Sequence, residues 1–448
     1  HLHIYFFFFF NATATSDIYT LSLHDALPIF IPSGTHTIKG KRTPQATYAL
    51  SVRHNQPIIP PFTGQWVGRE QEMQTLQQFL DPIFTTTQSP TFAGLLTLCG
   101  ESGIGKSRLL HELHIQVQAQ GRSHLWLIAP CDPVLQRAFS PFIHLLQNYF
   151  SQSNTISDSD NKARFLQKMQ ELRAWLQNTP TPQLPATIRT ALLRELERAD
   201  SFLGALLNLH WPNSIYEQLE PRLRFENTLY SFKALLQAES LRQPVILVLE
   251  DTQWLDPASL QLLETIVRPP HLFPYAILSV CRPQDDGSLP IFSPNQEIPQ
   301  ETIRLSSLST DKIQQMATDL LGAPIGQKLH TYLLEKTSGN PFLIEQILLD
   351  LQDRSGLQNQ DGKLELNPAT LPDIPTNLNA ILIARLDRLS SEVKQTVQTA
   401  VVLGYEFEIA ILSHMLNNNP LTLMLVTEAE KQAIWTVFQQ IDRKSVVE

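Results

Sequence analysis

Cysteine is scarce in this sequence. The 448 residues include three, Cys99, Cys131 and Cys281, and each lies in or beside an apolar run. Their positions show none of the spacings by which cysteines hold a metal ion. We therefore predict three reduced thiols in the core of a cytoplasmic protein.

Charged residues and long apolar runs are also few. Asp, Glu, Lys and Arg together make up 17% of the chain, and the formal net charge is -9. A mildly acidic chain attracts a polyanion poorly, so nucleic acid is not expected as a partner. No apolar run approaches the roughly 18 residues that a membrane span needs, so no membrane partner is expected either. The length fits about three domains.

The most informative stretch runs from Ala93 to Leu110. An apolar run predicts a short buried strand, a loop with Gly100, Gly103 and Gly105 follows, and an amphipathic helix comes next. Glycine admits backbone angles that other residues avoid, so successive amides can point at phosphate oxygens. The start of the helix adds unpaired N–H groups and the positive end of its dipole. The stretch therefore predicts a phosphate-binding loop.

Four further residues of this loop have predicted roles. The Lys106 ammonium would reach the terminal phosphates of ATP, and the Ser107 hydroxyl would ligate Mg²⁺. We also count Ile104 and Arg108 among the nucleotide-binding residues. The alternative is a chance match to the pattern, which the correctly placed strand and helix disfavour.

A second motif places two carboxylates after another apolar run. The run from Pro244 to Leu249 predicts a buried strand that delivers Glu250 and Asp251 to its carboxyl end, where ligands of open α/β sheets bind. One carboxylate can orient the water shell of Mg²⁺, and the other can polarise an attacking water. Which residue has which role stays open. The alternative is an acidic turn after a buried strand. The phosphate loop earlier in the chain disfavours this alternative, because the two motifs come in the order that the mechanism needs.

Together with Val67-Gly68-Arg69-Glu70, about thirty residues ahead of the loop, these motifs resemble those of STAND ATPases. These are AAA-like P-loop ATPases of signal transduction, found after class III nucleotide cyclases and in multidomain bacterial regulators. The resemblance runs from about Val67 to Leu416 and implies nucleotide contact for Val67 and Arg69. The family more often has Asp at the first acidic position, where this chain has Glu250.

The resemblance also implies roles for Arg282 and Pro341. Arg282 follows an apolar run at 275–281 and resembles the arginine that senses the γ-phosphate, for which a guanidinium offers a planar fork. The alternative is a solvated arginine after a strand. Gly339-Asn340-Pro341 resembles the Gly-x-Pro corner, whose proline packs on the adenine. The alternative is a plain helix-turn-helix corner, with Pro341 at the first helical position.

The expected fold class is α/β, a P-loop NTPase with a five-stranded parallel doubly wound sheet, followed by a helical lid and a winged-helix module. The expected boundaries follow the chain. They are a non-native or disordered leader at 1–30, a cyclase-domain tail at 31–56, a linker at 57–66, the ATPase core at 67–308 with a helical insertion at about 151–215, the lid at 309–370, a truncated winged helix at 371–442 and a non-native scar at 443–448.

The segments before the linker support these boundaries. The stretch from Asp17 to Ile29 resembles translated sequencing-library adapter, and it lacks the basic region and cleavage site of the alternative, a signal peptide. Residues 37–41 and 44–52 predict two strands around a turn. These strands resemble the closing strands of class III cyclase domains, and the alternative is an unrelated hairpin.

The expected function is a nucleotide-controlled switch with ATP and Mg²⁺ as cofactors. Slow hydrolysis between Lys106, Glu250 or Asp251, and Arg282 would release a lid that ATP holds closed. Self-association or fused signalling domains, a cyclase upstream and a repeat sensor downstream, are the expected partners. Two alternatives stay open, a scaffold that binds nucleotide without hydrolysis and a DNA-binding regulator. The winged-helix segment 373–416 has three basic and five acidic residues, which disfavours DNA.

Overall fold

The computed structural model describes the parts of the chain that carry the sheet, its helices and the lid. The described residues are 65–84, 91–132, 137–153, 156–179, 184–267, 272–283, 299–353 and 355–367, the backbone of 30–36 and 45–50, and the single residues 288, 394, 395 and 399. The chain divides into two compact units, 1–61 and 62–448.

The first unit contains an antiparallel pair of strands, β1 (Phe30–His36) and β2 (Gln45–Leu50). The second strand lies where the sequence predicts it. The described strand that pairs with it, β1, lies earlier in the chain than the strand expected at 37–41, with His36 opposite Gln45. Residues 37–41 themselves lie outside the described part of the chain.

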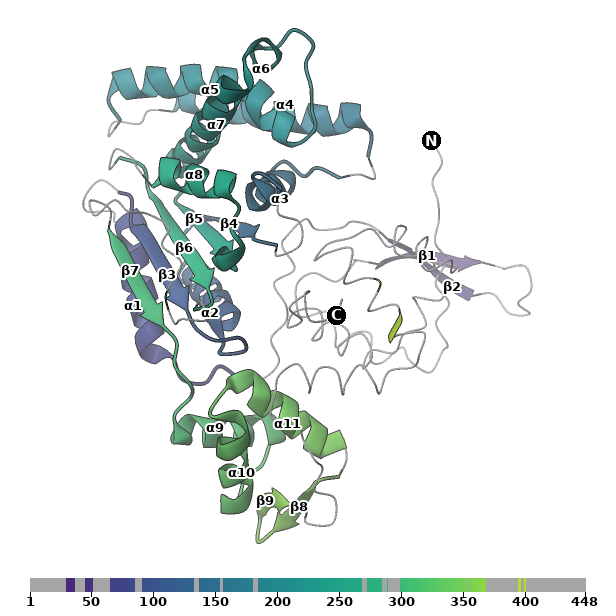
Figure 1. The fold of residues 1–448 in the computed structure, drawn as a ribbon. Coiled ribbons are helices and arrows are strands. Elements are labelled where there is room, and N and C mark those ends of the chain that lie inside the picture. Colours follow the sequence, from purple (N-terminus) through teal and green to yellow (C-terminus); the bar gives the residue numbers. More distant parts are fainter. Residues whose placement is uncertain are drawn as a thin grey trace. The chain divides into compact units, whose positions relative to one another are not determined.

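A five-stranded parallel sheet forms the centre of the second unit (Figure 1). All four neighbouring strand pairs are parallel, so the predicted sheet is confirmed. In spatial order the strands are β4 (Leu125–Pro130), β5 (Val245–Glu250), β6 (Tyr275–Cys281), β3 (Gly94–Cys99) and β7 (Gln300–Arg304).

The three inner strands form because their apolar runs are covered on both faces. Every residue of β3 and β6 is buried, and β5 is buried except for Glu250 at its end. Such continuous apolar strands are typical of parallel sheets between two helical layers. The edge strand β7 differs, since Ile303 is its one buried residue and its neighbours face solvent.

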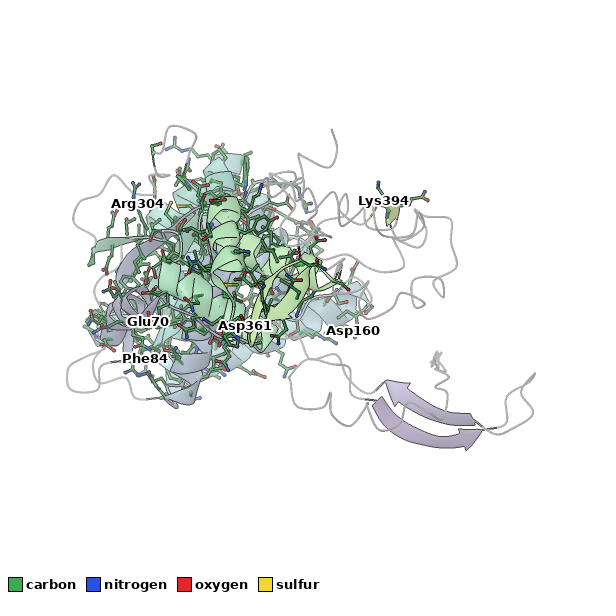
Figure 2. The ribbon with its side chains drawn as sticks, turned by 90° about the horizontal axis from the view of Figure 1, so that it is seen from below. Glu70, Phe84, Asp160, Arg304, Asp361 and Lys394 are labelled. Carbon is green, nitrogen blue, oxygen red and sulfur yellow. The ribbon has the colours of Figure 1, made fainter. Side chains whose placement is uncertain are left out.

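Helices cover both faces of the sheet, as a doubly wound fold requires. One face packs on α1 (Glu70–Phe84), whose two ends are labelled in Figure 2, and on α2 (Lys106–Ala119). The other face packs on three helices. They are α3 (Ser140–Tyr149), α7 (Pro221–Arg242) and α8 (Pro257–Ile266).

The predicted helical insertion contains α4 (Asp158–Asn178), α5 (Ala186–Leu206) and the short α6 (Ile215–Gln218). The two long helices α4 and α5 share one core with α3 and α7. Arg173 of α4 holds Asp200 of α5 by two hydrogen bonds of 2.7 and 3.1 Å, which fixes how these two helices align.

The lid contains α9 (Thr310–Leu321), α10 (Gln327–Thr337) and α11 (Pro341–Asp353). Beyond these expected helices, a hairpin of β8 (Leu357–Gln360) and β9 (Lys363–Leu366) follows α11. Glu365 of β9 accepts hydrogen bonds from the N–H groups of Lys328 and Leu329, so the hairpin caps the start of α10.

The expected winged-helix module at 371–442 lies outside the described residues, apart from single positions. Within the described residues, none of the helices is long and apolar enough to cross a membrane.

Candidate nucleotide-binding site

The loop between β3 and α2 needs each of its three glycines. Gly103 and Gly105 have φ values of +75° and +101°, in the left-handed region that favours glycine. Position 100 needs glycine for a steric reason, because a Cβ there would lie 2.9 Å from Cγ2 of Ile104. The sequence therefore builds a loop whose main chain is tightly wound and free of side chains at these positions.

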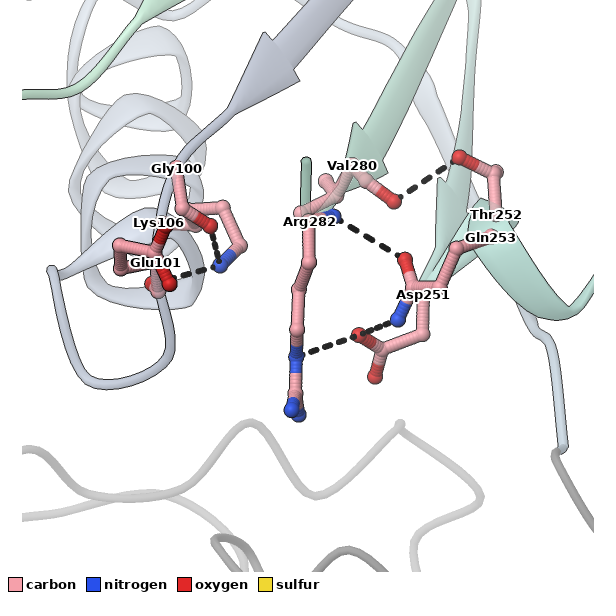
Figure 3. Close-up of polar contacts among 8 residues, drawn as sticks. All are labelled: Gly100, Glu101, Lys106, Asp251, Thr252, Gln253, Val280 and Arg282. Carbon is pink, nitrogen blue, oxygen red and sulfur yellow. Dashed lines mark hydrogen bonds and ion pairs between the residues drawn. The ribbon is translucent and has the colours of Figure 1, made fainter. Parts of the chain in front are cut away.

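Lys106 turns its ammonium group back into this loop. Its Nζ donates hydrogen bonds to the carbonyl oxygens of Gly100 at 2.7 Å and Glu101 at 2.9 Å (Figure 3). The residue is 8% exposed. This burial, together with the charge of Arg282, lowers the pKa of Lys106 to about 8, while the carboxylate of Asp251 opposes the shift.

The main chain of Ile104 points a second donor at the same place. Its N–H lies 3.4 Å from the Glu101 carbonyl oxygen, which also accepts from Lys106. Two donors therefore converge on one oxygen. The Ile104 side chain is 3% exposed and packs in the core beside α1 and α2, so only its main chain can serve a nucleotide.

The next two predicted residues lie in the first turn of α2. Ser107 is exposed, so its hydroxyl is accessible beside the loop. Arg108 forms an ion pair of 2.8 Å with Glu112, one turn further along the helix. The predicted nucleotide contact of Arg108 has no geometric support beyond this proximity to the loop.

The two carboxylates reach the same edge of the sheet as the loop. β5 runs parallel to β3 with β6 between them, so Asp251, Arg282 and the loop all follow carboxyl ends. Arg282 lies between Lys106 and Asp251 (Figure 3). Its Nε is 3.9 Å from Oδ1 of Asp251, and both side chains are about one-third exposed, at 34% and 31%.

Gln253 holds this pair from the side. Its Nε2 donates to Oδ1 of Asp251 at 3.0 Å, and its Oε1 accepts from the main-chain N–H of Arg282 at 3.1 Å. Thr252 fixes the same turn through its hydroxyl, which lies 2.9 Å from the Ser279 hydroxyl. One amide thus positions both charged partners.

The surroundings of Glu250 change the protonation of its carboxyl group. Its burial, and then the charge of Asp251, raise its pKa to about 7. The adjacent Asp251 adopts a left-handed conformation with φ +51°, which ends the strand. Glu250 therefore binds a proton more tightly than a solvent-exposed glutamate does.

Arg69 connects three parts of the fold. Its guanidinium pairs with Glu72 at 3.1 Å and donates to the carbonyl oxygens of Ile104, at 3.4 Å, and Ser306. The side chain is 9% exposed. Val67, the other residue predicted to contact nucleotide in this motif, is half-buried two positions earlier. Arg69 thus ties α1 to the phosphate loop and to the segment that leads into the lid.

The predicted corner at the start of α11 lies directly on the phosphate loop. Pro341 is the first residue of the helix and is half-buried. The neighbours of Pro341 make the contacts: Asn340 Nδ2 donates to the Ser102 carbonyl at 2.8 Å, and the Phe342 N–H donates to the Gly103 carbonyl at 3.2 Å.

Sequence reasoning missed two of these residues. Asn before Pro341 is a typical helix N-cap, so a cap at Asn340 could have been predicted, whereas its bond to a loop 238 residues away could not. For Gln253, the sequence indicates only that a polar residue lies two positions after Asp251, which is weaker evidence of a role than a helix cap.

The family comparison agrees with this geometry. Residues 65–278 match the model of a family described as AAA ATPase domain. This part of the chain is therefore similar to an AAA ATPase domain, which suggests ATP binding. The match ends inside β6, before Arg282 and the lid.

Individual relatives are distant. An uncharacterized protein of Rhizobium meliloti (strain 1021) is 24% identical over 403 residues, covering 86% of this chain and 35% of the relative. The chain thus spans about a third of that relative's length.

Two solved structures are remotely similar to the chain. Cdc6p from Pyrobaculum aerophilum has a TM-score of 0.38 and 14% identity, covering 87% of this chain and 89% of its own. A RuvB variant from Thermotoga maritima has a TM-score of 0.34 and 12% identity, covering 80% of this chain and 85% of its own. At these values nothing about function is carried over.

Proposed function

We propose that this chain is an Mg²⁺-dependent ATPase of the STAND type, which acts as a nucleotide-controlled switch in a larger cytoplasmic signalling protein. One observation carries the proposal: Lys106, Arg282 and Asp251 follow three adjacent strands and meet at one edge of the sheet. An ammonium, a guanidinium and a carboxylate in that order suit a polyphosphate with its metal ion.

The oxygen groups around the loop fit Mg²⁺, which prefers hydroxyl, carboxylate and phosphate oxygens. The exposed Ser107 hydroxyl and the carboxylates of Glu250 and Asp251 would hold it. When bound, the ion neutralises developing charge on the phosphates. Deprotonation of Glu250 near neutral pH fits this role, because its pKa is about 7.

The remaining steps fall to the side chains. Lys106 and the N–H of Ile104 bind phosphate oxygens in place of the Glu101 carbonyl that they now share. Asp251, partly exposed and oriented by Gln253, accepts a hydrogen bond from the attacking water. Arg282 offers its guanidinium to the γ-phosphate, and Pro341 with Val67 would border the adenine.

The switch follows from where the lid attaches. Its corner at Asn340 bonds to the phosphate loop, and its first helix is tied to α1 by the ion pair of Lys312 with Glu70 at 2.8 Å. A change at the phosphates therefore reaches the lid through the hydrogen bonds of Asn340 and Phe342 to the loop. The much longer relative supports further domains, for which a cyclase upstream and a repeat sensor downstream remain our proposal, as does self-association.

Phosphate release from ATP tests the proposal against the non-hydrolysing scaffold. We expect slow, Mg²⁺-dependent release by the wild type and a loss of about a hundredfold or more in Asp251→Asn, with ATP affinity retained. Asp319→Asn, on the exposed side of α9, is the matched control. Equal release by wild type and Asp251→Asn contradicts hydrolysis at this site.

A second measurement addresses the DNA-binding alternative. Duplex DNA is titrated with the protein at low and at moderate salt, because phosphate contacts weaken steeply as salt rises. We expect no binding at either salt. Salt-dependent binding would favour the regulator instead.

A further inference from the structure

The contact between the lid corner and the phosphate loop has a specific geometry. Asn340 Nδ2 donates to the Ser102 carbonyl at 2.8 Å, while Oδ1 of the same amide accepts from the N–H groups of Phe342 at 3.1 Å and Leu343 at 3.3 Å. One side chain therefore caps α11 and holds the loop at the same time. The neighbouring bond, from the Phe342 N–H to the Gly103 carbonyl, joins the next peptide of the loop to the same helix.

Peptide geometry extends this contact to the other side of the loop. In a trans peptide the carbonyl of one residue and the N–H of the next lie in one plane and point in opposite directions. Because the lid holds the carbonyls of Ser102 and Gly103, it also turns the N–H groups of Gly103 and Ile104 away from the lid. The Ile104 N–H indeed meets the Lys106 ammonium at the Glu101 carbonyl oxygen.

The packing leaves little freedom in this arrangement. A Cβ on Gly103 would lie 2.8 Å from Cβ of Phe342 and 2.9 Å from Oδ1 of Asn340. The loop and the corner are thus in direct contact, and a change in one requires the other to move.

We propose that Asn340 is a positioning residue for phosphate binding. By holding the Ser102 carbonyl it aims the Gly103 amide at the phosphates, beside the Ile104 amide that the Phe342 N–H orients, and so couples the docking of α11 to the presence of nucleotide. This proposal rests on the proposed ATP binding and adds the residue through which the lid senses it. Coupling of this kind is reciprocal, so ATP must stabilise the docked start of α11 as much as the docked helix favours ATP.

Asn340→Ser separates the two functions of the side chain. Serine caps a helix as well as asparagine does, but it offers no amide donor at the distance of the Ser102 carbonyl. We expect ATP affinity to fall about fivefold in calorimetric titration, the effect of one neutral hydrogen bond, with little change in melting temperature without nucleotide. Asn359→Ser is the matched control, because Asn359 accepts the Gly362 N–H at 3.0 Å in the β8–β9 turn of the same lid.

Hydrogen exchange distinguishes a positioning role of Asn340 from a purely structural one, because only the positioning role makes exchange in α11 depend on ATP. In the wild type, saturating ATP should slow the exchange of amides at the start of α11, from Phe342 onward, by about threefold or more. In Asn340→Ser at saturating ATP this slowing should be largely lost. The wild-type measurement stands even if the variant folds poorly.

The outcomes distinguish the two proposals. If wild type and Asn340→Ser bind ATP equally, or ATP binds without slowing exchange in α11 of the wild type, the role of Asn340 is overturned and ATP binding survives. If the wild type binds no ATP, both proposals are overturned.

Discussion

Asp251 and Arg282 face each other across 3.9 Å, from Oδ1 to Nε, although they follow different strands. This distance is at the outer limit of an ion pair, and both groups stay one-third exposed. Gln253 forms hydrogen bonds to both residues. These bonds, rather than the attraction between the two charges, set the spacing of Asp251 and Arg282. Each charged group therefore keeps capacity for a ligand.

Gln253→Glu should slow ATP hydrolysis and leave ATP affinity within about twofold. The glutamate still accepts from the Arg282 N–H, but it loses the donor to Asp251 and adds a negative charge beside it. We expect phosphate release to fall about tenfold. Gln261→Glu, exposed on α8, controls for the added charge. Unchanged release would mean that Gln253 does not position Asp251.

ATP affinity should fall as pH rises above about 8. The pKa of Lys106 is about 8 in the protein, and bound phosphates would raise it. Above this pH, Lys106 has lost its proton and must take one up again when ATP binds. By linkage the affinity then falls by up to about tenfold per pH unit. Calorimetry between about pH 7 and pH 9 measures this. Lys106→Arg, whose guanidinium keeps its proton, should show a flat profile. A flat wild-type profile would contradict the burial of a titrating lysine.

His114 should make the protein less stable as pH falls. Its ring packs against Trp126 at 4.5 Å, and its Nδ1 lies 3.4 Å from Nε2 of His124. Burial first, then the charges of His124 and His111, lower the pKa of His114 to about 4. The unfolded chain, with a histidine pKa of about 6.5, binds more protons between these values, so the free energy of unfolding decreases from about pH 6.5 to pH 4.

The variant His114→Phe isolates that contribution. Phenylalanine retains the ring contact with Trp126 but binds no proton. Urea unfolding of the variant should depend less steeply on pH over this window than that of the wild type. Identical pH dependence of the two proteins would contradict the assignment.

Arg69→Lys should lower stability without any nucleotide present. Lysine keeps the charge but cannot reach the Ile104 and Ser306 carbonyls with one planar fork. We expect the free energy of unfolding to fall by about 1 to 3 kcal/mol. Arg122→Lys, in the exposed pair with Asp81, should change it by less than about 1 kcal/mol. If Arg69 only contacts nucleotide, Arg69→Lys will match the wild type in this measurement.

The sheet could be predicted from the sequence because its signals are local. Apolar runs such as 245–249 specify a strand covered on both faces, and Gly103 and Gly105 mark a loop by their conformational freedom. The positions of Lys106 and Asp251 at one edge follow from parallel topology alone.

Contacts between distant segments could not be predicted in the same way. The bond of Asn340 to Ser102 depends on how the lid packs, and no periodicity encodes it. The three protein contacts of Arg69 also depend on tertiary packing, so a local motif indicated only that this residue was functional. The hairpin at the end of the lid was missed because its strands are short and neither has a fully buried residue.

Calorimetric titration of ATP and Mg²⁺ into the wild type and Lys106→Ala tests the central claim most directly. Lys328→Ala, exposed on the lid, is the control. We predict binding to the wild type and to Lys328→Ala, and none to a folded Lys106→Ala, because the alanine removes the buried ammonium at the centre of the loop. Undiminished ATP affinity in a folded Lys106→Ala protein would contradict a nucleotide site at this loop.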